Sequence, residues 1–104
     1  MIRVRFKTVN GLIHGYQING HADVDDIGQD IVCAAVSSAA LMTVNTITEI
    51  IGTHALIVTR SGFMYVRITD RVDACQDILN GFRLHLQALE EQYPTRVHLM
   101  NTEV

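Results

Sequence analysis

The chain has 104 residues, 48% of them apolar and 18% charged, a composition typical of one globular domain. With 8 Lys and Arg against 11 Asp and Glu, its formal net charge is −3, and no basic cluster or interleaved aromatic residue suggests a nucleic-acid groove. The apolar run from about Ile31 to Met42 is shorter than the about 20 residues that a bilayer requires. We therefore expect a soluble cytoplasmic protein with two free thiols, while one disulfide stays open as an alternative.

The first 20 residues predict a β-hairpin. Apolar and charged residues alternate from Ile2 to Thr8, which is typical of a half-buried strand, and Asn10-Gly11 is typical of a type I′ turn. In an unbroken register, Tyr16 and Ile18 would lie on the charged face. A one-residue bulge within His14-Gly15 is therefore predicted, since it returns both side chains to the buried face.

A glycine, an acidic segment and an apolar helix follow this hairpin. The second strand is expected to end near Gly20, where a glycine lets another backbone approach closely. The loop Ala22–Gln29 has little to bury, so we expect it to be mobile. Asp30 is predicted to be the N-cap of a helix that continues to about Ile51 and ends at Gly52. Nearly all its positions are apolar, which predicts a central buried helix.

This reading places Cys33 in the first turn of a helix. Unpaired N–H groups and the helix dipole favour a thiolate there, so Cys33 is a candidate nucleophile and His21, at the preceding strand end, a candidate base. Asp30, Cys33 and Ser37 are spaced three and four residues apart and share one helix face. The Asp30 carboxylate disfavours the same thiolate, so its net effect is open. Ser37 is expected to bind either substrate or a carbonyl of its own helix.

The second half of the chain predicts another hairpin, a helix and a short edge strand. The predicted elements are strands 54–59 and 63–69, a helix over 72–92 and a strand over 96–100. The order ββαββαβ predicts a single domain over residues 1–104, an α+β two-layer sandwich. Its antiparallel or mixed sheet of about five strands would carry two helices on one face.

The predicted hairpin over residues 54–69 has two apolar faces. Met64, Val66 and Ile68 are expected to face the helices. The opposite face is more apolar than a solvated surface usually is, which suggests that two copies of the chain meet there. This opposite face, the hairpin surface, consists of Leu56, Val58, Phe63 and Tyr65.

Each candidate residue also has an ordinary structural explanation. Buried helix cysteines are usually inert, as we expect for Cys75, and a histidine at a strand end is commonplace. A metal site is a further alternative, because His14, His21, Cys33 and the loop aspartates supply ligand types. Their spacings match no zinc or EF-hand signature, so we expect no metal and no cofactor.

Three short segments carry a family resemblance. They are GHA at 20–22, GQDIVCAAVS at 28–37 and TVN at 43–45. Together they resemble the motif of the ribosomal-processing cysteine protease family Prp, also described as YsxB-like proteins. The motif spans Gly20–Asn45, and the element order extends the resemblance over most of the chain.

The resemblance implies specific roles for five residues. His21 and Cys33 would form the catalytic dyad, while Gly20, Asp30 and Ser37 occupy positions that match the substrate-site residues of the family. In the mechanism this implies, the thiolate attacks the scissile carbonyl and the histidine moves the proton. N–H groups at the helix start would stabilise the oxyanion.

The resemblance also implies a substrate. The family removes a short N-terminal extension from a bacterial large-subunit ribosomal protein, cutting after an aromatic residue, and its members are cytoplasmic homodimers. We expect the peptide to pair with the strand that leads to Gly20, and the loop Ala22–Gln29 to move to admit it. The alternative is a non-catalytic module that binds ribosomal or translation components, in which Cys33 only packs.

Overall fold

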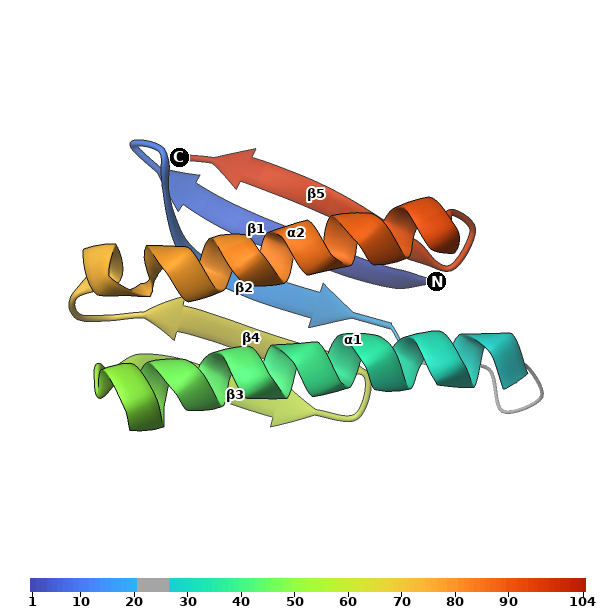
Figure 1. Cartoon of the computed structure of the whole chain (residues 1–104), viewed down its shortest axis with the longest axis horizontal. Helices are drawn as coiled ribbons and strands as arrows, with labels where there is room; N and C mark the ends of the chain where they lie inside the picture. The colour runs from blue at the N-terminus through green and yellow to red at the C-terminus, as the bar shows by residue number, and fades with distance from the viewer. Residues whose placement is uncertain (21–26) are drawn as a thin grey trace.

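The computed structural model describes residues 1–20 and 27–104, with side-chain surroundings from residue 31 onward in the second range. A five-stranded mixed sheet in the order β3-β4-β2-β1-β5 carries both helices on one face (Figure 1). Its elements are β1 (Ile2–Val9), β2 (Leu12–Asn19), α1 (Ile27–Asn45), β3 (Ala55–Arg60), β4 (Phe63–Ile68), α2 (Gln76–Gln92) and β5 (Val97–Glu103). The predicted α+β sandwich with the order ββαββαβ is confirmed.

The N-terminal hairpin has the predicted turn and bulge. Asn10 and Gly11 both have positive φ, 52° and 79°, as a type I′ turn requires. The register pairs Phe6 with Tyr16, then shifts so that His14 is the extra residue of the bulge. Tyr16 is consequently 2% exposed and lies in the core.

Helix α1 begins earlier than the sequence predicts. It starts at Ile27, so the prediction that Asp30 is its N-cap is wrong, and Asp30 lies within the helix. Glycine and aspartate near a helix start cost only about 1 kcal/mol or less each in propensity, so they do not fix its boundary. The other end agrees with prediction: a π-helical extension, Thr46–Ile51, leads to Gly52, which has φ 77°.

From residue 31 onward, only one side of α1 is buried, so the expectation of a central buried helix is wrong. Its buried positions, such as Val32 and Val36, pack on the sheet, while Ile31 and Met42 are 58% and 54% exposed. A two-layer sandwich leaves the outer side of its helices uncovered.

The apolar run in α1 is longer than expected, because it extends through the π-helical segment. Ile31–Ile51 has 21 residues and a mean hydropathy of 1.7, long and apolar enough to cross a membrane by length and composition. In the fold, its buried positions form part of the core beside the sheet.

Aromatic packing fixes the helices against the sheet. The Phe82 ring of α2 lies 4.8 Å from the Tyr16 ring and 5.6 Å from the Phe6 ring, measured between centroids. The Tyr16 hydroxyl donates a hydrogen bond to the Ala40 carbonyl of α1 at 2.9 Å. Burial raises the pKa of Tyr16, which keeps this donor protonated.

The C-terminal half also follows the prediction. The second hairpin pairs Thr59 with Met64 and Ala55 with Ile68, the predicted register. Strand β5 lies at the sheet edge, parallel to β1, and is longer than the short strand predicted.

Candidate active site

The first component of the site is Gly20, directly after β2. Its N–H donates a hydrogen bond to the Gly62 carbonyl at 2.9 Å, which joins the end of β2 to the turn between β3 and β4. Its φ is 109°, and an added Cβ would lie 2.2 Å from the Met1 carbonyl oxygen. The predicted close backbone approach is confirmed, and the backbone that approaches is the N-terminus of this chain.

Cys33 and Ser37 supply the helix side of the site. They are four residues apart on α1, so both face the tip of the second hairpin. Cys33 is half-buried against the core, and Ser37 is exposed. Both line a cleft of about 220 Å³ that also contains Gly20. The structure therefore brings together three of the five predicted site residues.

The rest of the cleft is largely apolar. Its lining is completed by Ile18, Ala40, Leu41, Thr59, Arg60, Gly62, Phe63 and Met64. The Arg60 guanidinium lies 4.7 Å from the centroid of the Phe63 ring, so the one cation among the described lining residues is held over an aromatic face. No local motif marked the hairpin residues as part of a site, because they meet α1 only in the folded chain.

The position of Cys33 differs from the predicted one. It is the seventh residue of α1, in the second turn rather than the first. The helix dipole acts mainly within the first turn, and an interior N–H bonds the carbonyl four residues back. Cys33 therefore lies one turn further from the helix start than the sequence suggested, and an oxyanion at Cys33 would not meet unpaired helix N–H groups there.

The structure places only one of the two remaining predicted site residues, and only by its backbone. His21 lies outside the described residues, as does most of the predicted mobile loop Ala22–Gln29, whose last three residues belong to α1. Asp30 is placed by its backbone in the first turns of α1, one turn before Cys33.

The expected path of the peptide along β2 is wrong. Strand β2 pairs with β1 on one side and with β4 on the other, as far as Asn19. Its backbone hydrogen bonds are therefore used within the sheet, and an added strand has no free edge there. A peptide that enters the described cleft would therefore lie beside Gly20 at the strand end, and not along β2.

The second cysteine lies in a different environment. Cys75 is 0% exposed and its thiol donates to the Arg71 carbonyl, with a sulfur–oxygen distance of 3.7 Å. Burial raises the pKa of this thiol, the Asp73 carboxylate raises it further, and Arg71 opposes both. Both cysteines are free, so the disulfide alternative is wrong. Cys75 is the core residue that the sequence predicted.

Within the described ranges, no group of three His, Cys, Asp or Glu residues is placed to hold a metal ion. The chemistry available in the described cleft is that of a thiol beside an apolar cavity.

Comparison with known proteins identifies the family. The model of the family described as cysteine protease Prp matches residues 1–98. The chain belongs to the Prp family of cysteine proteases. The resemblance carried by the motif over Gly20–Asn45 is thereby confirmed.

Individual Prp proteins are similar along most of their length. The ribosomal processing cysteine protease Prp of Staphylococcus aureus is 33% identical over 97 residues, covering 88% of this chain and 92% of that protein. The Bacillus subtilis Prp is 27% identical over 88 residues, covering 78% and 79%.

Solved structures share the fold. The S. aureus Prp in complex with a substrate peptide superposes with a TM-score of 0.89 at 29% identity, covering 98% of this chain and 100% of that one. The S. aureus Prp with a covalently linked product peptide gives 0.87 at 30% identity, with the same coverage.

Proposed function

We propose that this Prp-family protease removes the N-terminal extension of a bacterial large-subunit ribosomal protein, cutting after an aromatic residue. The observation that carries the proposal is the half-buried Cys33 thiol on the wall of an apolar cleft. The S. aureus relative is named a ribosomal processing protease and has been solved with a substrate peptide and with a covalently linked product peptide.

Cys33 is the proposed nucleophile and His21 the proposed base. The Cys33 sulfur attacks the scissile carbonyl, His21 takes the thiol proton and passes it to the leaving amine, and water then hydrolyses the thioester. His21 follows Gly20 directly in the sequence, and Gly20 lines the same cleft as Cys33.

The cleft suits an aromatic side chain. Its volume of about 220 Å³ exceeds the roughly 150 Å³ of an apolar cavity that accommodates benzene. Ile18, Leu41 and Met64 supply apolar walls. Ser37 and Asp30 lie one turn after and one turn before Cys33 on α1, where we propose that they contact the peptide on either side of the scissile bond.

We propose in addition that the chain acts in the cytoplasm as a homodimer that forms through the hairpin surface. Leu56 and Val58 of that surface are 45% and 38% exposed and lie next to each other on one face of β3, and exposed apolar patches often mark protein–protein contacts. Sedimentation across micromolar concentrations tests this, and a monomer throughout would refute it.

Mass spectrometry of a cleaved peptide tests the proposed function. The substrate is a synthetic ribosomal-protein N-terminal extension that contains an aromatic pair, incubated under reducing conditions with wild type and with Cys33→Ala. We expect a single cut after the aromatic residue with wild type alone. A matched peptide with leucine in place of the aromatic residue should be cut at least about tenfold more slowly, since a misfitting apolar group costs about 1–3 kcal/mol. Equal cleavage of the two peptides would remove the aromatic specificity.

A further inference from the structure

Neither helix covers the outer face of the sheet (Figure 1). Exposed basic side chains gather on this face. Strand β1 presents Arg3, Arg5 and Lys7 there, and all three are exposed. The register places Arg67 of β4 in the same row as Lys7, with only Gly15 of β2 between them. We call Arg3, Arg5, Lys7 and Arg67 the basic strip.

No carboxylate of the strands neutralises the basic strip. Glu103 is the one acidic residue in the five strands, and it bonds the Thr8 hydroxyl on the opposite, helix-covered side. Among the described residues, none forms an ion pair with a residue of the strip, and Arg5 makes only a weak contact with the Met100 sulfur at 3.9 Å. The strip holds four of the eight Lys and Arg of a chain whose net charge is −3. The charge is therefore divided unevenly between the two faces.

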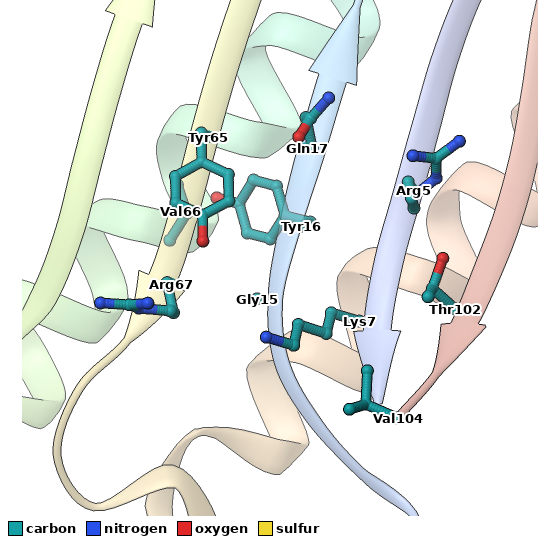
Figure 2. Close-up of a pocket in the computed structure, with 10 residues that line it drawn as sticks. All are labelled: Arg5, Lys7, Gly15, Tyr16, Gln17, Tyr65, Val66, Arg67, Thr102 and Val104. Atoms are coloured by element: carbon teal, nitrogen blue, oxygen red, sulfur yellow. The ribbon is translucent and has the colours of Figure 1, made fainter. Parts of the chain in front are cut away.

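The basic strip borders a hollow of about 170 Å³ (Figure 2). Gly15 is part of its lining and cannot carry a side chain, because an added Cβ would lie 2.1 Å from the Val66 carbonyl oxygen. In Figure 2, Lys7 extends from β1 toward β2 at Gly15, and the Tyr65 ring stands on β4 across the hollow. The hollow thus combines cations with the half-buried Tyr65 ring. Because Tyr65 also belongs to the hairpin surface, a ligand on this ring and the proposed homodimer would compete for it.

We propose that the basic strip binds single-stranded RNA, with phosphates on its cations and a base stacked on Tyr65. Cations two residues apart on β1 lie about 6.8 Å from each other, comparable to the spacing of successive phosphates along an extended nucleic-acid strand. A ring on an open sheet face is a stacking platform for bases of any sequence. An acidic peptide would use the cations but not the ring, and the observations therefore favour RNA.

The net negative charge of the chain does not oppose this site strongly. Most of the described acidic residues outside the strands belong to the helix layer, on the other side of the sheet from the basic strip, and exposed charges more than about 8 Å apart are largely screened at physiological salt. The site also lies apart from the cleft of Cys33, and its occupancy does not depend on the proposed peptidase activity.

Fluorescence anisotropy with a labelled single-stranded RNA of about a dozen nucleotides tests the proposal with the full chain. We expect the affinity to fall steeply between about 50 and 200 mM salt, and Arg5→Glu to weaken binding about tenfold and reduce the salt slope by about 0.7 for the lost phosphate contact. Arg83→Glu is the matched control, because it makes the same charge change on α2 and should leave both quantities close to wild type. Tyr65→Leu should weaken binding at least about fivefold with an unchanged salt slope.

Three results would overturn the proposal. The first is no measurable binding at about 50 mM salt, where phosphate contacts are strongest. The second is equal weakening by Arg5→Glu and Arg83→Glu, which would show that net charge alone matters. The third is a poly-glutamate peptide that binds as tightly as the RNA and ignores Tyr65→Leu, which would assign the strip to an acidic protein segment. Circular dichroism on each variant separates these results from loss of the fold. A sedimentation coefficient that changes with Arg5→Glu while RNA binding is absent would assign the strip to a contact between two copies.

Discussion

The two cysteines occupy opposite kinds of environment within one small domain. Cys75 ends a short 3-10 helix, Val72–Cys75, directly before α2. It is fully buried, and its thiol donates a hydrogen bond to a carbonyl four residues earlier. Cys33 packs against the same core from α1, yet it is only half-buried and lines the cleft with Gly20.

The difference arises from what faces each helix. Cys75 lies where α2 meets the sheet, so protein surrounds its sulfur on every side. Cys33 faces the tip of the β3–β4 hairpin, where the strands end and leave a gap between helix and sheet. The ends of the strands therefore give Cys33 both access to the cleft and an apolar wall.

The largest expected effect separates the cysteines by activity. Cys33→Ala should lower kcat/KM for the peptide by about 10⁴ or more, because removing a nucleophile abolishes the covalent step. Cys75→Ala should keep activity within about threefold of wild type, provided that the assay temperature is below its lowered Tm. Both variants are measured by continuous peptide cleavage. Comparable losses in the two would show that stability, and not the thiol, limits the rate.

Thiol reactivity gives the next largest difference. Iodoacetamide should alkylate Cys33 at least about 100-fold faster than Cys75 in the folded protein, because Cys75 reacts only after local or global opening. Peptide mapping after timed quenching measures both rates, and the same reaction in denaturant should bring the rates close together.

The same experiment with His21→Ala sharpens the comparison. If His21 is the base, its removal should slow alkylation of Cys33 near neutral pH and leave Cys75 unchanged. An unaltered Cys33 rate would separate His21 from the thiol and leave the family dyad without support in this chain.

The cleft around Cys33 depends on Gly20, for which the chain supplies a matched control. Gly20 and Gly52 both have positive φ, 109° and 77°, but only at Gly20 would an added Cβ collide with backbone. Gly52→Ala should cost about 1 kcal/mol of stability from its dihedral strain, and Gly20→Ala at least about 3 kcal/mol. Thermal unfolding measures both. Equal losses of stability in the two variants would mean that the Met1 backbone moves away from residue 20 without measurable strain.

Patterns with a short period predicted the sheet well. Three signals predicted the register and the bulge. They are the alternation from Ile2 to Thr8, the Asn10-Gly11 turn, and the position of Tyr16, which would face solvent in an unbroken register. Each of these signals is local, because side chains alternate along a strand and a turn depends on two residues.

Boundaries and long-range contacts were harder to predict. The start of α1 was placed at Asp30 on a capping preference worth only about 1 kcal/mol, too little to fix a boundary in a folded chain. The hydrogen bond from Gly20 to Gly62 joins residues 42 positions apart, and the row that unites Lys7 with Arg67 spans 60. No local pattern encodes either contact, so the hairpin wall of the cleft and the basic strip became visible only in the folded chain.

The smallest expected effect is the pH dependence of the free energy of unfolding that the raised pKa of Cys75 should cause. Its folded pKa is raised, so below the unfolded value of about 8.5 the thiol is protonated in both states and contributes no pH dependence. Above that value the unfolded chain loses the proton first, and stability should fall with rising pH by at most about 1.4 kcal/mol per pH unit. Urea unfolding from about pH 7 to 9.5 measures the slope below the range in which tyrosine titrates. Cys75→Ala should flatten this part of the curve and Cys33→Ala should retain it, whereas a slope that survives in Cys75→Ala would assign the titration to another group.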